Sequence, residues 1–295
     1  MTRPQPRSTA SYYTENLTDR VELKMVRLPS GSFWMGTEER EVARLNRAYN
    51  VNYNFRAETP QHEVKIPAFA IGCYPITQEQ WQIVARWEKV NRELDPNPSQ
   101  FQDDYQAIAR WQRPVESISW EDAREFCARL SRKTQKDYRL PTEAQWEYAC
   151  RSVIAQNLTV EEWNRKHNRS FHFGDKISPD LANYNGNYIY GKNIRGKDRN
   201  QTTPVGHFKI TNNWGLYDLH GNVWEWCEDD YHSSYQGAPT DGSAWLSGGN
   251  SVKILRGGSC FLSPRYCRSA CRAWDTMSDR GSGFGLRVVL LFEGN

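Results

Sequence analysis

The chain has 295 residues, and its 38 Lys+Arg against 35 Asp+Glu give a formal net charge of +3. This balance argues against a dedicated nucleic-acid-binding protein, which carries a clear basic excess. No apolar run approaches the roughly 20 residues of a membrane-spanning helix, and 12 Trp with 15 Tyr exclude a disordered chain. We therefore expect a folded protein that binds neither nucleic acid nor membrane.

The N-terminal segment 1–20 is polar and lacks the apolar stretch of a secretory signal. We expect it to be a flexible arm, followed by one domain over residues 21–295. The odd count of seven cysteines excludes complete disulfide pairing within the chain. Unpaired thiols suit a reducing compartment, so we expect a cytoplasmic protein.

Short strands are indicated in the first quarter of the domain. Met25–Leu28 and Phe33–Gly36 flank a Pro-Ser-Gly turn, which predicts a hairpin. The polar residues 37–59 predict a long loop. The alternating pattern of His62–Ile66 predicts a strand, which Phe69–Tyr74 continues after a proline.

Helix starts are well marked in the middle of the chain. Thr77 with Gln80, and Thr142 with Gln145, have the spacing of a capping box. Ser119 precedes two acidic residues, which the helix dipole favours in a first turn. We expect a helix to begin at each of these three positions.

The amino-acid composition of the chain changes after Arg151. Residues 151–250 are rich in Gly, Asn, Asp, Tyr and Trp, and predict loops with scattered short strands. The apolar run Gly285–Phe292 predicts a central strand. The whole indicates one α+β domain of short antiparallel strands, a few helices and many loops.

Several longer motifs, in this order and spacing, resemble the formylglycine-generating enzyme (sulfatase-modifying factor) family. This resemblance covers nearly the whole chain and implies an irregular C-type-lectin-like fold. The motifs are Phe33-Trp34-Met35-Gly36, Arg139-Leu140-Pro141-Thr142-Glu143, Gly215-Leu216-Tyr217-Asp218, Gly221-Asn222-Val223-Trp224-Glu225-Trp226, Arg256-Gly257-Gly258-Ser259 and Gly285-Leu286-Arg287.

The resemblance also locates the family's catalytic copper site. Members that oxidise a sulfatase cysteine hold copper with two cysteines, three and eight residues after the Ser of Gly-Gly-Ser. Those positions are Leu262 and Cys267 here, so the pair is broken. Cys267 with a displaced partner, Cys260 or Cys271, is the only catalytic candidate, and we do not expect copper to be bound.

The segment 256–289 is also similar to the variable region of proteins diversified by retroelements, a non-catalytic branch with a lectin-like fold. Adenine-directed mutation of Asn codons cannot produce Lys, Glu or Gln, and these residues are absent from 254–292. Trp274 and Met277 are also beyond its reach, so they would be fixed by the template. The resemblance implies that a ligand would contact Cys260, Phe261, Leu262, Ser263, Tyr266, Cys271, Ala273, Trp274, Gly281, Ser282, Gly283 and Phe284, with Arg265, Arg268, Arg272, Arg280 and Arg287 as scaffold.

The family binds calcium through carboxylates and carbonyls, the ligands that this cation prefers. The resemblance implies one site at Asp218, Gly221, Val223 and Glu225, and a second at Asn183, Tyr184 and Asp198. For Glu225, a salt bridge to one of the many arginines is the alternative.

Two functions remain open. One is a binding module that presents a diversified C-terminal face to a protein ligand. The alternative is a copper-dependent formylglycine-generating oxidase, or a related thiol oxidoreductase, that acts through Cys267. The leucine at position 262 favours the binding module.

Overall fold

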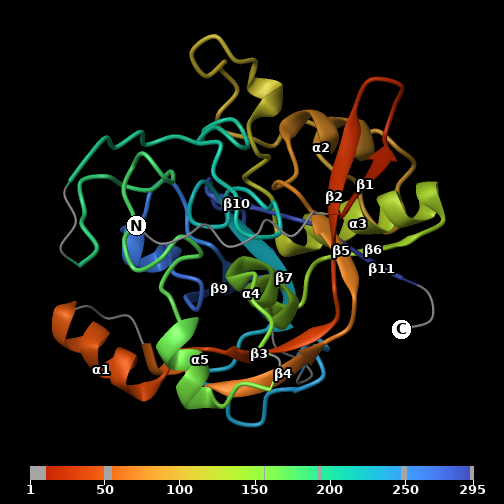
Figure 1. Ribbon diagram of the computed structural model, residues 1–295. Helices are drawn as coiled ribbons and strands as arrows, with labels where there is room; N and C mark the ends of the chain where they lie inside the picture. The colour runs from red at the N-terminus through yellow and green to blue at the C-terminus, as the bar shows by residue number, and fades with distance from the viewer. Residues whose placement is uncertain (1–10, 50–54, 156, 192–194, 247–250, 293–295) are drawn as a thin grey trace.

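The structure is a computed structural model that describes residues 11–49, 55–155, 157–191, 195–246 and 251–292 (Figure 1). Within them, short strands, helices and long loops follow one another irregularly, which confirms the predicted α+β class. None of the helices in these ranges is long and apolar enough to cross a lipid bilayer. The helices are α1 (Glu39–Ala48), α2 (Gln78–Ala85), α3 (Trp120–Thr134), α4 (Glu143–Arg151) and α5 (Val160–Lys166), and the 3₁₀ turns are η1 (Phe55–Glu58), η2 (Arg110–Gln112) and η3 (Pro264–Cys267).

The first sheet joins distant parts of the chain. Its antiparallel strands lie in the order β1-β2-β5-β11-β6, so the last strand of the chain sits inside the sheet. The strands are β1 (Ser11–Asn16), β2 (Glu22–Leu28), β5 (Phe69–Gly72), β11 (Val289–Leu291) and β6 (Asp137–Arg139).

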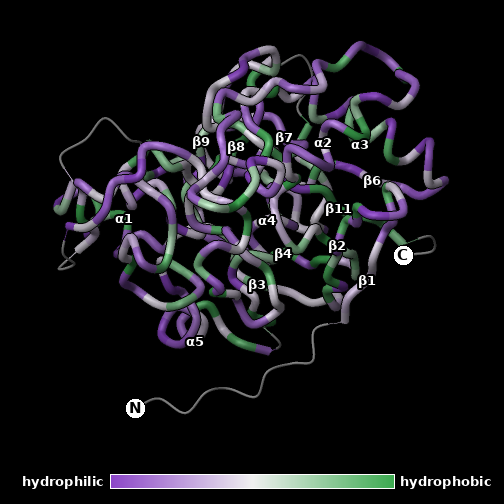
Figure 2. The backbone as a smooth tube through the Cα atoms, turned by 90° about the horizontal axis from the view of Figure 1, so that it is seen from above, coloured by the Kyte–Doolittle hydropathy of each residue, from purple (hydrophilic) through white to green (hydrophobic). Residues whose placement is uncertain are grey.

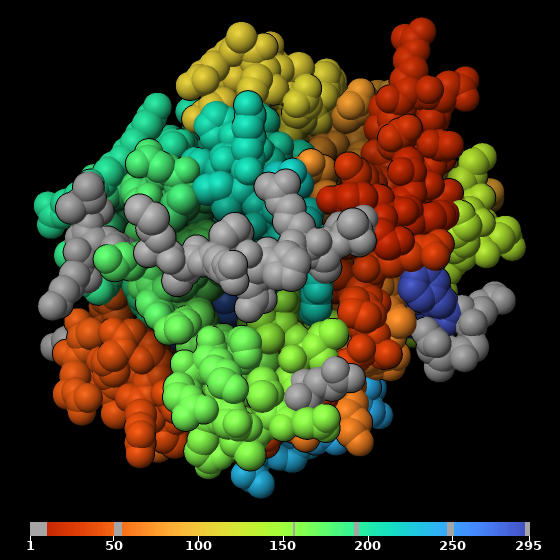
Figure 3. Space-filling view, in the orientation of Figure 1, coloured from red at the N-terminus to blue at the C-terminus, as the bar shows by residue number. Residues whose placement is uncertain are grey.

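The prediction that the N-terminal segment is a flexible arm is wrong for residues 11–16. Residues 11–16 form β1 and pair with β2, from Ser11 opposite Arg27 to Asn16 opposite Glu22. β1 is an edge strand with mostly exposed side chains, which is why its sequence is polar. The β1–β2 hairpin projects at the upper right of Figures 1 and 3. Residues 1–10 lie outside the described ranges.

The second sheet carries the C-terminal segment. Its order is β10-β7-β8-β9, with β10 parallel to β7 and the other pairs antiparallel. The predicted strand over 285–292 is therefore divided, since β10 belongs to the second sheet and β11 to the first. The strands are β7 (Trp224–Asp230), β8 (Val252–Arg256), β9 (Arg272–Thr276) and β10 (Phe284–Gly285).

The predicted early hairpin is also wrong. β3 (Gly31–Met35) pairs with β4 (His62–Ile66) in a separate two-stranded sheet. Both edges of β2 are already occupied by β1 and β5, so β3 has no place beside it. The predicted loop over 37–59 contains α1, a polar helix that buries only Val42 and Leu45.

The three predicted helix starts are confirmed. Thr77, Ser119 and Thr142 each cap a helix, and each side chain accepts a hydrogen bond from the main-chain N–H three residues later. The helix α5 was not predicted, although Thr159 forms a capping box with Glu162.

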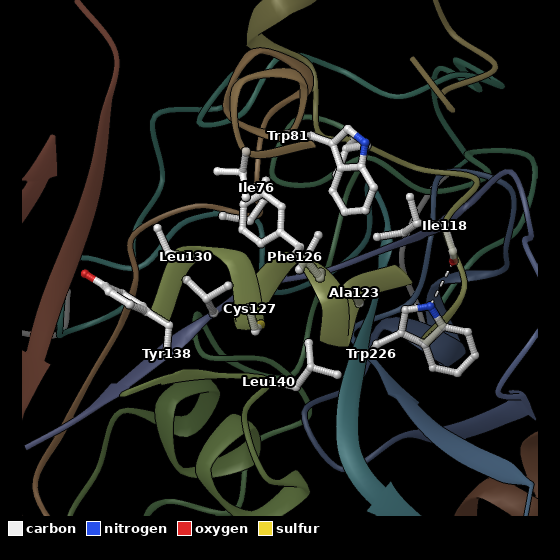
Figure 4. Packing of buried hydrophobic residues seen from close by; sticks show 14 of the residues in the cluster. Ile76, Trp81, Ile118, Ala123, Phe126, Cys127, Leu130, Tyr138, Leu140 and Trp226 are labelled. Atoms are coloured by element: carbon white, nitrogen blue, oxygen red, sulfur yellow. Dashed lines mark hydrogen bonds between the residues drawn. The ribbon is translucent and has the colours of Figure 1, made fainter. Parts of the chain in front are cut away.

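Large aromatic side chains fill the interior. In Figure 4, Trp81 stacks on Phe126 with ring centroids 5.3 Å apart, and the Trp226 indole N–H donates to the Ile118 carbonyl at 3.0 Å. These side chains belong to one cluster of buried hydrophobic residues, which we call the first cluster. It includes Trp81, Ile118, Phe126, Trp226 and Leu255. The second cluster lies under β3 and β4 and includes Phe33, Trp146, Cys227 and Ile254. In Figure 2, purple hydrophilic residues follow the outer loops around these interiors.

Candidate functional site

Buried arginines hold the C-terminal segment in place. Each contacts a buried glutamate from another part of the chain and also donates to main-chain carbonyls. Such charge-assisted pairs fix geometry as well as contributing energy. The pairs are Arg256 with Glu147 (2.5 Å), Arg268 with Glu58 (2.5 Å), Arg272 with Glu143 (2.7 Å) and Arg287 with Glu225 (2.8 Å).

The other two predicted scaffold arginines lie nearer the surface. Arg280 is half exposed and pairs with Asp122 at 2.7 Å. Arg265 donates to the Tyr266 hydroxyl at 3.2 Å and lies over the ring of Tyr49. Arg268, Arg272, Arg280 and Arg287 thus each pair with an acidic residue from a distant segment, whereas Arg265 does not, and the scaffold role of the set stays a prediction.

The catalytic position of the family has no accessible thiol in this chain. Leu262 occupies the first cysteine position, and Cys260 and Cys267 are fully buried. Burial raises the pKa of both thiols, so both are protonated at neutral pH. The Cys267 sulfur also lies close to Gly258, where an added Cβ would be only 2.6 Å from it. A buried, protonated thiol is a poor nucleophile and a poor copper ligand.

The predicted ligand-contacting residues do not all reach the surface. Cys260, Ser263, Cys271 and Gly283 are buried, so their inclusion in a ligand face is corrected. They face inward because the segment folds back over the first cluster, which includes Cys271. The half-buried residues are Phe261, Leu262, Tyr266, Ala273, Gly281, Ser282 and Phe284, and Trp274 is exposed.

Trp274 lies apart from the other predicted residues. Ala273 packs against the first cluster together with Leu262 and Tyr266. Trp274 instead contacts Tyr231 with the two rings tilted, and the Tyr231 ring packs against the second cluster. Consecutive residues of a strand point to opposite faces, so Trp274 and Ala273 lie on the two sides of β9.

Residues from distant segments extend the surface around Leu262. Phe101 stacks on Phe261 with centroids 6.0 Å apart, and the Leu262 carbonyl accepts from the main-chain N–H of the turn that begins at Asn185. Tyr188 and Ile189 in this turn are 52% and 43% exposed. No local pattern marks these residues as surface groups. We define the loop surface as Phe101, Tyr188, Ile189, Phe261, Leu262 and Tyr266.

Three cavities lie outside this surface, one of them a cavity of about 470 Å³ between β4 and residues 240–241. A polar crevice of about 310 Å³ between α1 and the segment 268–270 is lined by arginines that are already ion-paired, such as Arg44 with Glu41. A groove of about 1190 Å³ runs between α3 and the loop 241–246. None of these three cavities is lined by a predicted ligand-contacting residue.

The contacts of Glu225 disagree with the first predicted calcium site. Its carboxylate accepts from the Trp146 indole N–H at 2.7 Å and from Arg287 at 2.8 Å. A guanidinium in direct contact already neutralises this carboxylate and would repel a cation. The Gly221 carbonyl likewise accepts from the Val223 N–H at 3.0 Å. The alternative of a salt bridge to an arginine describes Glu225 correctly.

The remaining predicted calcium ligands differ in burial and in their contacts. Asp218 accepts from the Gly206 N–H at 2.6 Å, and burial raises its pKa to about 6. The Asn183 side-chain oxygen is buried with no hydrogen-bond partner, Tyr184 is buried, and Asp198 is half-buried. Within the described residues no three acidic, His or Cys side chains group as metal ligands. Calcium at either predicted site stays a prediction.

The sequence model of one protein family, the Sulfatase-modifying factor enzyme 1-like domain, matches residues 13–291 of the chain. The chain belongs to this family. It is 28% identical to the formylglycine-generating enzyme of Mus musculus, over 90% of the chain and 74% of that protein. It is also 27% identical to the inactive C-alpha-formylglycine-generating enzyme 2 of the same species, over 80% of the chain and 73% of that protein.

Solved structures share the fold. PvdO from Pseudomonas aeruginosa is 28% identical and superimposes with a TM-score of 0.71, covering 95% of this chain and 98% of its own. Treponema denticola variable protein 1 superimposes with the same TM-score at 22% identity. This superposition covers 96% of the present chain and 99% of the variable protein. These similarities confirm the fold that the family resemblance implies.

Proposed function

We propose that the protein is a ligand-binding module that holds a protein ligand on the loop surface. This proposal rests on the difference between the buried arginines and the partly exposed side chains of the segment 256–289. The arginines are locked into buried ion pairs, whereas Phe261, Leu262 and Tyr266, which lie between Arg256 and Arg268 in the sequence, are partly exposed. Aromatic side chains on an open surface suit protein recognition, and a fixed scaffold lets such positions vary without loss of the fold.

The absence of a paired, accessible thiol separates this proposal from oxidase activity. The family includes a relative named as inactive, so membership alone does not imply catalysis. The seven buried thiols also support a cytoplasmic location.

A displayed library tests the proposed binding face. Phe261, Leu262, Tyr266 and Ser282 are randomised together, and binders are selected against a panel of unrelated folded proteins. We expect most members to fold and some to bind one target specifically. A matched library at Arg256, Arg268, Arg272 and Arg287 should fail to fold. Loss of folding in the first library, or no specific binder from it, would overturn the proposal.

An oxidation assay tests the alternative. The protein is titrated with copper(I) and incubated with a sulfatase-type cysteine peptide and oxygen. We expect no stoichiometric copper binding and no formylglycine. Turnover that disappears in Cys267→Ser would establish the oxidase instead.

The gene's surroundings test the diversification itself. We expect a near-repeat of the 3′ end of the coding sequence, close to a gene for a reverse transcriptase. Without both, the loop surface would be a fixed binding face rather than a diversified one.

A further inference from the structure

β9 is an edge strand with main-chain groups that point away from the sheet. Among the strands of the described ranges, it pairs only with β8. The Met277 N–H donates to the Ser251 carbonyl at 2.7 Å, immediately beyond the paired residues. In an antiparallel ladder the hydrogen-bonded residues alternate, so Asp275 faces β8 and the N–H and C=O of Trp274 point outward.

The next outward-facing residue is already satisfied. The Thr276 N–H donates to the Asp275 carboxylate at 2.8 Å, and its carbonyl accepts from the Asp279 N–H at 3.1 Å. Trp274 therefore offers the donor and acceptor pair that a further strand would use. Proteins protect exposed edges with lysine, proline or a bulge, and the sequence of β9, Arg-Ala-Trp-Asp-Thr, has neither lysine nor proline.

The two faces of β9 differ in character. On one face the Trp274 ring is 52% exposed and rests on Tyr231, with centroids 5.4 Å apart. On the other face Asp275 lies opposite Lys253 in register, but the Lys253 ammonium contacts Asp230 at 2.6 Å instead. One face of the edge is thus apolar and the other is acidic.

The acidic face carries two aspartates close together in the chain. Asp275 lies on β9, and Asp279 lies in the turn that follows it, where its main-chain N–H donates to the Thr276 carbonyl at 3.1 Å. Arg280, the neighbouring cation in the sequence, is paired with Asp122. Among the ion pairs within the described ranges, none neutralises Asp275 or Asp279, so a ligand cation could pair with them at this position.

We propose that β9 binds an extended peptide by strand addition, with an apolar side chain over Trp274 and basic side chains beside Asp275 and Asp279. Main-chain hydrogen bonds to Trp274 would give affinity, and the alternating side chains would give specificity. The inference goes beyond the proposed function, because Trp274 lies on the opposite side of β9 from the residues that pack beside the loop surface.

Fluorescence anisotropy with labelled peptides tests the inference on the full chain. The probe is a peptide of alternating lysine and valine, about eight residues long, a length typical of a short strand. We expect saturable binding of this probe. A peptide of alternating glutamate and valine should not bind, and neither should the lysine–valine peptide with alternate main-chain nitrogens methylated.

Variants locate the binding. Trp274→Ala, and the double change Asp275→Asn with Asp279→Asn, should each weaken binding about tenfold, with near-ultraviolet circular dichroism confirming that both fold. Asp241→Asn, which removes an exposed acid elsewhere, and Leu262→Ser, on the loop surface, should leave the affinity unchanged. No saturable binding, equal binding of the methylated peptide, or no effect of either β9 variant would overturn the inference. None of these outcomes depends on the loop surface.

Discussion

Glu147 shares its carboxylate among three donors in the centre of the molecule. It accepts from Arg256 at 2.5 Å, from Arg151 at 2.8 Å and from the Gly36 N–H at 2.9 Å, and it is fully buried. Although burial acts to raise it, the two guanidinium groups hold the pKa of Glu147 below its ordinary value. This carboxylate is therefore ionised in the folded protein at neutral pH.

Glu147→Gln should destabilise the protein strongly. The amide cannot neutralise Arg151 and Arg256, and breaking a buried ion pair from one side costs about 3–5 kcal/mol. Urea unfolding measures the change. Asp175→Asn, in a pair with Arg169 whose side chains are about half exposed, should cost no more than about 1 kcal/mol. Equal losses in the two variants would contradict the argument.

A buried histidine predicts how stability depends on pH. The His220 Nδ1 lies 2.7 Å from the Cys267 carbonyl and donates to it, while Nε2 accepts from the His172 N–H at 3.0 Å. Burial lowers the pKa of His220 to about 4. The unfolded chain takes up this proton near pH 6.5, so the stability from neutral His220 is complete above that pH and declines as the pH falls towards 4.

His220→Asn should reduce this pH dependence. Asparagine keeps an N–H for the Cys267 carbonyl but does not titrate. Between pH 7 and pH 4 the wild type should lose about 3 kcal/mol more unfolding free energy than the variant. Urea unfolding at several pH values gives both curves, and parallel curves would rule out the role given to His220.

The elements that could be predicted from sequence depend on local contacts. The caps of α2, α3 and α4 use hydrogen bonds between residues three positions apart, so a short motif contains all the information. The partner of β3 could not be predicted, because it depends on which edges of β2 are occupied. The helix α1 was missed because only two of its residues are buried.

The cap of α2 gives a prediction at this scale. The Thr77 hydroxyl accepts from the Gln80 N–H at 3.2 Å, and the Gln80 side chain accepts from the Thr77 N–H at 2.9 Å. Thr77→Ala should cost about 1 kcal/mol, since it leaves a helix N–H without its acceptor. Thr77→Ser should restore most of the loss in thermal unfolding. An alanine variant as stable as the serine variant would show that the cap contributes nothing.

At the scale of the whole molecule, the candidate site combines residues that the sequence identifies with others that only the fold brings together. Leu262 in place of a cysteine can be found by counting from Ser259. Phe101 joins the loop surface by stacking on Phe261, and the turn that carries Tyr188 joins it through the hydrogen bond from the Asn185 N–H to the Leu262 carbonyl. The pairing of Glu225 with Arg287 likewise joins residues 62 positions apart, which is why the family's calcium pattern could not reveal it.

Removal of the last strands should abolish cooperative folding. A chain that ends at residue 283 lacks β10 and β11, so β5 and β6 lose the strand between them. We expect no cooperative transition in urea, monitored by tryptophan fluorescence. A synthetic peptide of residues 284–292, added in excess, should restore the transition at least in part. A truncated chain that unfolds cooperatively without the peptide would contradict this role of β11.

The position of β11 has a consequence for biosynthesis. Domains begin to fold while the ribosome is still adding residues, but this chain cannot close its first sheet until its final strand has been made. The segment 256–289 is translated just before that closure. Any amino-acid change in this segment must therefore still let β11 insert between β5 and β6, because the first sheet closes only when that strand is in place.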